Sequence, residues 1–159
     1  MQTFLPSSSF EESAKWLDDR RLNKQILEAR TIYEIIINNK ASGAWVNHPI
    51  TKMWRDYPEA LSLYYNACLS QWKHVRCRNH KYRMIPIYKS SVILPSWLGD
   101  ERLHSSHRAN LLRKDYKFYS RYGWDENSME YWRFPYWWGE EYGYGKEPII
   151  KREINFLIS

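Results

Sequence analysis

Apolar residues recur at helical spacing along much of this chain, and the longest regular stretch is Leu17–Ile36. Apolar positions within it fall three or four residues apart, which predicts a helix with one face packed into a core. The predicted core positions are Leu22, Ile26, Ala29, Tyr33 and Ile36.

The start of this helix is marked by a run of three serines. Two serine–glutamate pairs there have the spacing of a capping box, Ser8 with Glu11 and Ser9 with Glu12. We therefore expect a helix over about residues 10–39, either continuous or broken near Asp18.

Three further stretches have helical patterns. Prolines open two of them, at Pro49 and Pro58, where a missing N–H is tolerated. The third is Glu101–Lys114, which continues after a break as Tyr116–Arg121 and stops at Gly123.

The remaining stretches lack regular periodicity. Residues 78–95 contain two prolines and predict a loop, whereas Ile149–Ile158 fits either a short strand or a helical turn. We expect an all-α fold, a single domain over residues 1–159 with three main helices, long loops and an irregular, aromatic-rich C-terminal segment.

Positive charge is concentrated in one part of the chain. The formal net charge is +6, and no acidic residue lies between Glu59 and Asp100. That interval contains Lys73, Arg76, Arg78, Lys81, Arg83 and Lys89. Such a stretch favours a phosphate-rich partner, although a basic, solvated surface is the alternative.

Aromatic residues crowd into residues 131–144, which also contain Pro135, Gly139 and Gly143. The crowded residues are Tyr131, Trp132, Phe134, Tyr136, Trp137, Trp138, Tyr142 and Tyr144. The segment is either a stacking surface for nucleic-acid bases or an arm that covers the helices.

The cysteines and the hydropathy indicate the cellular compartment of the protein. Cys68 and Cys77, nine residues apart, would face opposite sides of one helix, so a reduced, intracellular protein is expected. We find no signal peptide and no apolar run of the roughly 20 residues that span a bilayer. The sequence thus predicts a cytoplasmic protein.

Glu28 is the first candidate for chemistry. It shares a flank of the first long helix with Arg21 and Lys24. A carboxylate held among cations beside a core suits chemistry on a polyanion. The alternative is a solvated glutamate that pairs with Lys24 one turn earlier.

Three ordered blocks of sequence carry a family resemblance. The first contains residues 3–6 and 17–28, the second residues 45–61, and the third residues 95–115 with Tyr122-Gly123-Trp124. Together they resemble the pyrimidine dimer DNA glycosylase family, over about residues 1–125. The resemblance implies a small all-α enzyme that removes a pyrimidine base from duplex DNA, and it places the catalytic glutamate at Glu28. We expect no cofactor.

The chemistry agrees with that placement. Breaking an N-glycosidic bond builds positive charge on the sugar, which a carboxylate can stabilise, and the nucleotide must first leave the stack. The expected DNA contacts are Arg20, Arg21, Lys24, Asn47, Arg55, His107, Arg108, Asn110, Arg113 and Lys114.

The histidines leave several alternatives open. His48 is a second candidate catalytic residue, as a base contact or proton carrier, or else it caps the turn before Pro49. His104 and His107 lie three residues apart and form a hydrogen-bonding cluster or a metal site. Cys68, His74, Cys77 and His80 match no common zinc spacing, so we expect no metal.

The start of the chain departs from the family pattern. In the relatives of the phage endonuclease V, the nucleophile is the α-amine exposed when the initiator methionine is removed. Here Gln2 follows Met1, and a bulky second residue usually blocks that removal. A lyase step through a Schiff base and a hydrolytic, base-only reaction therefore both stay open.

Several functions fit these features. A glycosylase could remove an ultraviolet pyrimidine dimer, or a bulky modified base such as the glucosylated hydroxymethylcytosine of some phage genomes, as antiviral defence. A DNA-binding module without catalysis and an RNA-acting protein are the alternatives. The expected partner is double-stranded DNA, bound by a monomer.

Overall fold

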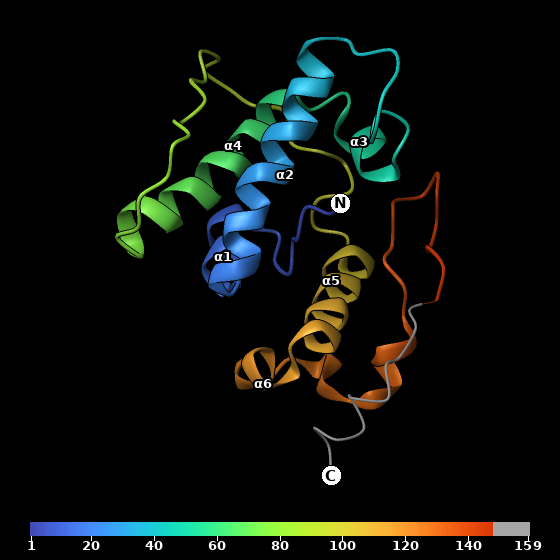
Figure 1. The fold of residues 1–159 in the computed structure, drawn as a ribbon. Coiled ribbons are helices and arrows are strands. Elements are labelled where there is room, and N and C mark those ends of the chain that lie inside the picture. Colours follow the sequence, from blue (N-terminus) through green and yellow to red (C-terminus); the bar gives the residue numbers. More distant parts are fainter. Residues whose placement is uncertain (148–159) are drawn as a thin grey trace. The chain divides into compact units, whose positions relative to one another are not determined.

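The computed structural model describes residues 1–147, except for the side chain of Met129, and it contains two compact units (Figure 1). The first unit is Met1–Leu98 and the second begins at Gly99. Regular structure in the described residues is helical, apart from one isolated antiparallel bridge between Trp137 and Tyr144. The predicted all-α fold is confirmed. The prediction for Ile149–Ile158 lies outside the described residues.

The first unit is built on two long helices that pack together, α2 (Asp19–Ile37) and α4 (Pro58–Ser70). The short helices α1 (Phe10–Trp16) and α3 (Pro49–Trp54) pack against α4 and α2 respectively. A π-helical turn, η1 (Gln71–Val75), extends α4. None of the described helices combines the length and the apolar character that a membrane crossing needs.

The predicted first helix is two helices, because Asp18 caps the second. The Asp18 carboxylate accepts a hydrogen bond from the Arg21 N–H at 3.0 Å. Ser9 caps α1 by accepting from the Glu12 N–H at 3.2 Å, as the capping spacing predicts. The Glu12 carboxylate, however, accepts from the Ser7 hydroxyl, so the reciprocal half of the capping box is replaced.

Arg76 closes the break between α1 and α2. Its guanidinium donates to the Leu17 carbonyl, which follows the end of α1, and pairs with Asp19 at 2.7 Å. One side chain from the segment after α4 thus satisfies groups at the end of one helix and the start of the next.

The buried face of α2 differs in part from the prediction. Leu22, Ile26 and Ala29 are fully buried, as expected. Beyond them the buried residues are Ile32 and Ile35, while Tyr33 and Ile36 are half-buried. Gln25, which the apolar pattern leaves out, is also fully buried.

The chain before α1 is an extended segment, Gln2–Pro6, whose five residues are all buried. It runs alongside α2 (Figure 1) and pairs with no strand in the described part of the chain. Side chains therefore have to satisfy its backbone groups.

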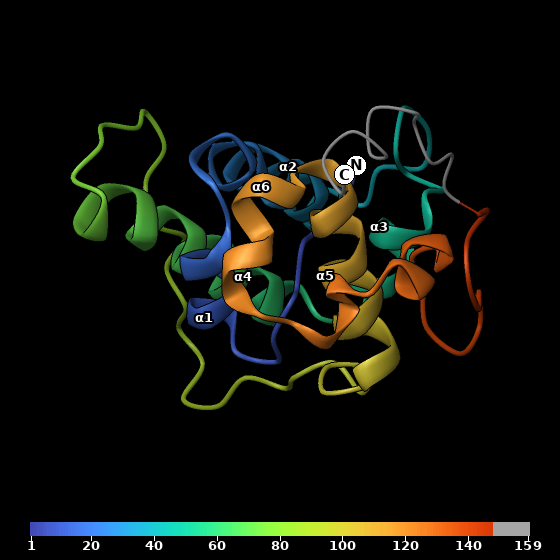
Figure 2. The same cartoon turned by 90° about the horizontal axis from the view of Figure 1, so that it is seen from below.

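Residues 73–89, which we call the basic segment, begin in the last part of η1, and the chain after η1 folds back on α4 (Figure 2). Asn66 holds the returning chain, since its amide donates to the Ile85 carbonyl and accepts from the Ile85 N–H, both at 2.8 Å. The predicted loop is confirmed. Cys77 lies in this loop rather than on the helix, is exposed, and is free, as is the buried Cys68.

The second unit is organised around α5 (Glu101–Lys114), whose bounds match the prediction. The short helices α6 (Tyr116–Tyr119), η2 (Ser120–Tyr122), η3 (Asp125–Asn127) and η4 (Met129–Arg133) follow. Gly123 ends η2 in the left-handed region at φ 63°, where glycine is favoured.

The aromatic segment 131–144 is irregular, and part of it covers α5. Trp132 and Trp137 are buried, and the Trp137 N–H donates to the Ser106 hydroxyl at 3.2 Å. The covering arm expected as one alternative is therefore present. The segment also carries half-exposed rings, Phe134 and Tyr144 among them.

His107 lies inside the second unit, and burial lowers its pKa to about 3, with further contributions from His104 and Arg108. The unfolded chain binds the same proton with a pKa near 6.5. The unfolded state therefore takes up more protons below pH 6.5, so the stability of the fold decreases as the pH falls through that range.

We predict that replacing His107 by Gln weakens this dependence. Between pH 7 and pH 5 the wild type should lose about 2 kcal/mol more unfolding free energy than the variant, since the variant has no buried imidazole to protonate. Urea unfolding at both pH values measures the difference. The exposed His74→Gln is the matched control, and an equal loss in wild type and His107→Gln would contradict the prediction.

Candidate active site

Glu28 projects from the middle of α2 beside the buried N-terminal segment. Its side chain is 13% exposed, and its Oε1 lies 3.6 Å from the Lys24 Nζ. The other oxygen, Oε2, accepts from the Gln2 backbone N–H at 3.2 Å and from the Gln25 side-chain amide at 3.3 Å. The predicted pairing with Lys24 is present, but the carboxylate is largely shielded from solvent and accepts two hydrogen bonds besides that ion pair.

Gln25 connects this carboxylate to the core. Its Oε1 accepts from the Phe4 N–H at 2.8 Å, and the Tyr64 hydroxyl lies 2.8 Å from the same oxygen. The Tyr64 hydroxyl is also 2.8 Å from the Phe4 carbonyl. Burial raises the pKa of Tyr64 well above 10, so this phenol stays protonated and serves as a donor.

The N-terminal segment also contacts α3. The Trp54 indole N–H donates to the Thr3 hydroxyl at 2.9 Å, and both side chains are fully buried. Trp54 in turn contacts the edge of Trp97, with ring centroids 4.8 Å apart. These contacts fix the segment between α2 and α3. Glu28 lies on α2, and His48 is the N-cap residue of α3.

His48 lies at the start of α3 and near the chain's first amine. Its Nδ1 accepts from the Ile50 N–H at 3.2 Å, so the capping role considered for this histidine is present. Burial lowers the pKa of His48, and the positive amine at the start of the chain lowers it further. The imidazole is therefore neutral at pH 7, and the chain's first amine lies within its electrostatic range.

The predicted DNA contacts of the first unit differ in their exposure to solvent. Arg20 and Asn47 are exposed, and Lys24 is 68% exposed. Arg21 is half-buried and pairs with Asp18 at 2.8 Å. Arg55 is exposed, donates to the Val46 carbonyl, and helps to line a polar cavity of about 420 Å³.

The basic segment carries less unpaired charge than its sequence indicates. Arg76 and Arg78 both pair with Asp19, and Lys89 pairs with Glu59 at 2.5 Å. Lys73 donates to the Tyr82 carbonyl at 2.7 Å. Among the described residues, no carboxylate lies within ion-pair range of its ammonium group. Within residues 1–147, Lys81 and Arg83 likewise have no such carboxylate.

The comparisons with known proteins bear on this first unit. A family model described as pyrimidine dimer DNA glycosylase matches residues 1–85. The chain belongs to this family. Searches of curated proteins and of solved structures gave no significant match.

Family membership supports a DNA glycosylase that acts on pyrimidine damage. The matched range holds Glu28, Gln25 and His48 together with the buried N-terminal segment, and it ends inside the basic segment. The sequence resemblance over about residues 1–125 is therefore confirmed as a family assignment, with the match itself confined to residues 1–85.

The predicted DNA contacts of the second unit lie outside that match and have protein partners. His107 and Asn110 are buried, and the Asn110 amide donates to the Ser106 carbonyl. Arg108 pairs with the buried Glu126 at 2.8 Å and with Glu101. Arg113 donates to the carbonyls of Tyr131, Trp132 and Phe134.

Burial, which removes water from the guanidinium, lowers the pKa of Arg113 to about 10. Lys114, the last of these predicted contacts, is exposed. A DNA contact by any of these five residues stays a prediction. The protein contacts of the four residues other than Lys114 give them a structural role in the second unit.

No cluster of three or more histidine, cysteine or acidic side chains in residues 1–147 could hold a metal ion. The hydrogen-bonding alternative for His104 has direct support, because its Nε2 accepts from the Gly99 N–H at 3.0 Å.

Sequence reasoning missed Gln2, Gln25 and Tyr64 as parts of the site. Gln25 could have been found, because it falls between Leu22 and Ala29 on the apolar face, where a polar residue needs a buried partner. The role of the Gln2 backbone carries no sequence signal, since any residue supplies that N–H.

We predict that Gln25→Leu destabilises the protein by about 2–4 kcal/mol, because the buried Phe4 N–H and Tyr64 hydroxyl lose their shared acceptor. Urea unfolding measures the change. Thr31→Leu, a polar-to-leucine change on the exposed face of the same helix, is the matched control. Equal stability of the two variants would refute the role given to Gln25.

Proposed function

We propose that the protein is a DNA N-glycosylase whose catalytic carboxylate is Glu28. The observation that carries the proposal is the placement of this side chain. A largely buried carboxylate is oriented by the Gln2 N–H and the Gln25 amide, within the part of the chain that matches the family.

The reaction accounts for a carboxylate in such a place. As the bond between the base and C1′ breaks, positive charge develops on the sugar ring. A negative group already fixed beside the ring stabilises that charge without having to reorganise. The same carboxylate can accept the proton of an attacking nucleophile as the new bond to C1′ forms.

The target nucleotide has to leave the duplex before this chemistry occurs. A base in the stack hides its sugar, so a protein that works at C1′ binds an extruded nucleotide. We propose that Arg20, Lys24, Asn47 and Arg55, which are exposed on the unit that carries Glu28, bind the phosphates on either side. Arg21, already paired with Asp18, is proposed to orient the start of α2 toward them.

Two nucleophiles could attack C1′ in this reaction. Water would give a base-only glycosylase, whereas a primary amine would give a Schiff base and allow strand cleavage. The backbone nitrogen that donates to the carboxylate is that of Gln2, which in this chain is a peptide N–H. It would be a primary amine in a form that starts at Gln2.

We predict that Glu28→Gln reduces base release by at least about 100-fold and leaves DNA affinity nearly unchanged. The variant keeps the shape of the side chain and removes its negative charge. The measurement is base release followed by mild alkali cleavage, on a duplex with a thymine dimer and on one with normal bases only. Glu34→Gln is the matched control, because Glu34 is a half-exposed glutamate of the same helix, paired with Arg30.

Base release retained in Glu28→Gln would remove Glu28 from the catalytic role. No release by the wild type from any of the duplexes, including the modified one described next, would favour the DNA-binding module if binding stays tight. A third duplex with glucosylated hydroxymethylcytosine tests the other pyrimidine substrate. Release from that duplex alone would replace dimer repair by an activity against modified phage DNA.

We also predict that the nucleophile depends on the first residue. Protein prepared to start at Gln2 should be trapped on DNA by borohydride, because its amine would lie about 3.2 Å from the Glu28 carboxylate. Protein that retains Met1 should release the base without trapping. Mass spectrometry of each preparation identifies the first residue. Equal trapping of both forms would show that the amine of Met1 is itself competent.

A further inference from the structure

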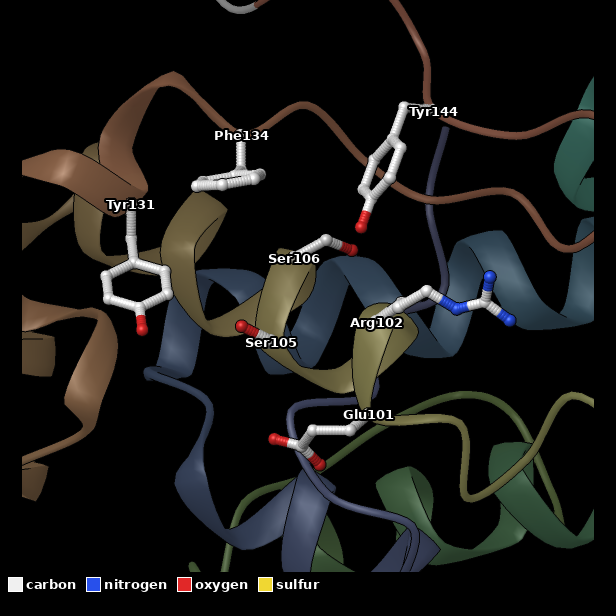
Figure 3. A pocket seen from close by; sticks show the side chains of 7 residues that line it. All are labelled: Glu101, Arg102, Ser105, Ser106, Tyr131, Phe134 and Tyr144. Atoms are coloured by element: carbon white, nitrogen blue, oxygen red, sulfur yellow. The ribbon is translucent and has the colours of Figure 1, made fainter.

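The second unit contains a pocket of about 280 Å³ that the proposed catalytic site does not use. One wall is α5, and the other is formed by the rings of Tyr131, Phe134 and Tyr144 (Figure 3). The Phe134 centroid lies 5.8 Å from that of Tyr131 and 6.5 Å from that of Tyr144. Phe134 and Tyr144 are 46% and 47% exposed, so this wall presents apolar ring surface to the solvent.

The charged residues of the lining, Arg102 and Glu101, have opposite partners. Arg102 pairs with Asp100 and with Glu140. Glu101 pairs with Arg108. Because each charge is already paired, the lining attracts neither a phosphate nor a metal ion. Its chemistry suits an apolar occupant.

The hydroxyls on the helix wall are also engaged. Ser106 donates to the Leu103 carbonyl at 2.8 Å and accepts from the Trp137 N–H at 3.2 Å. Ser105 hydrogen-bonds to Glu126. An occupant of the pocket therefore gains mainly by removing apolar surface from water, rather than by hydrogen bonds to α5.

The chain leaves the aromatic wall at a fixed point beside the pocket. The Trp138 N–H donates to the Gly143 carbonyl at 2.8 Å, and the Gly145 N–H donates to the Tyr136 carbonyl at 2.7 Å. A side chain at position 145 is disfavoured, because its Cβ would lie 2.7 Å from the Trp138 Nε1. These contacts hold the chain next to Tyr136, two residues along from Phe134.

The next stretch of sequence is rich in apolar residues. We call residues 148–159, which follow the described part of the chain, the 148–159 segment. Half of its residues are large and apolar, namely Ile149, Ile150, Ile154, Phe156, Leu157 and Ile158. So many apolar side chains in a short stretch favour packing against another apolar surface.

The pocket lies within reach of the first two of these side chains. Tyr144, the residue before Gly145, itself lines the pocket. Ile149 and Ile150 follow Gly145 by four and five residues. An extended chain spans at most about 3.5 Å per residue, so both stay within roughly 18 Å of the point where Gly145 is held.

The distribution of charge favours the same occupant. Residues 130–147 carry four glutamates and two cations, a formal net charge of −2 in a chain whose net charge is +6. Glu130 and Glu141 are exposed and have no ion pair among the described residues. The 148–159 segment carries Lys151, Arg152 and Glu153, a net charge of +1. Opposite charges favour contact between the two stretches.

From these observations we propose that the pocket is the docking site of the 148–159 segment of the same chain, with Ile149 and Ile150 entering it. Its volume lies just below the range of small-molecule pockets, about 300–1,000 Å³, and accommodates two aliphatic side chains. The docked segment covers Phe134 and Tyr144 and adds apolar contacts to the second unit. The inference concerns residues outside the family match and is independent of the proposed catalysis.

The test measures whether the segment shields the pocket in the full-length chain. Ser105→Cys places a thiol in the lining, and Cys77→Ser removes the exposed natural thiol. Labelling by a maleimide should be slow. Replacing Ile149 and Ile150 by Asp should raise the rate at least about tenfold, because the reagent reaches only molecules whose segment is released. Equal rates with and without these replacements would overturn the proposal.

The matched control replaces Asn155 and Ser159 by Asp, which adds the same two charges to the segment at polar positions. Labelling of this control should stay slow. A rate as high as that of the double variant at Ile149 and Ile150 would show that charge, rather than apolar docking, governs access to the pocket, and docking would be rejected. Thermal unfolding of each variant identifies any change in the fold.

A second measurement keeps the segment apolar. Ser105→Cys combined with Ile150→Cys, again with Cys77→Ser, should form a disulfide within one chain on mild oxidation, since that bond needs Cβ atoms about 4 Å apart. Mass spectrometry identifies the linked peptides. Absence of the bond would refute docking, and a disulfide-linked dimer would assign the pocket to a second copy instead. Both measurements are made without DNA, so their outcome is separate from that of base release.

Discussion

The buried segment Gln2–Pro6 imposes the main constraint on the first unit. An extended chain inside a helical fold has no neighbouring strand, so its N–H and carbonyl groups need partners from side chains. Gln25 and Tyr64 supply them for Phe4, and Glu28 accepts from the Gln2 N–H. The polar residues inside this core follow from the need to hold that segment.

The same constraint explains how the Glu28 carboxylate can be held in a fixed orientation beside a core. An unpaired charge at this depth would be costly, but the hydrogen bonds that secure the N-terminal segment also stabilise Glu28. The same set of hydrogen bonds therefore both holds the N-terminal segment and orients the Glu28 carboxylate. Changes in Gln25 or in the backbone near Gln2 should affect stability and chemistry together, whereas changes in Glu34 should affect neither strongly.

Local signals predicted the helices well because those signals act within a few residues. Ser9 and Asp18 cap helices where the sequence pattern placed a start and a break, and Pro49 and Pro58 open the next two. The position of Glu28 beside the core followed from helical spacing, while its catalytic role stays a prediction. The bonds of Gln25 to Phe4 and Tyr64 join residues far apart in sequence, and periodicity holds no information about them. From the sequence alone, Arg108 and Arg113 likewise resemble surface cations. In the structure the chain after α5 provides their partners, Glu126 for Arg108 and backbone carbonyl groups for Arg113.

The ion pairs of the basic segment have a consequence for how the protein responds to ionic strength. Cations that already pair with Asp19 or Glu59 would release fewer counterions from a DNA backbone than unpaired cations would. Counting all six cations would suggest a logarithmic salt slope near −5, whereas Lys73, Lys81 and Arg83 alone would give roughly −3. Binding of DNA by this segment would therefore be less sensitive to salt than its cation count indicates.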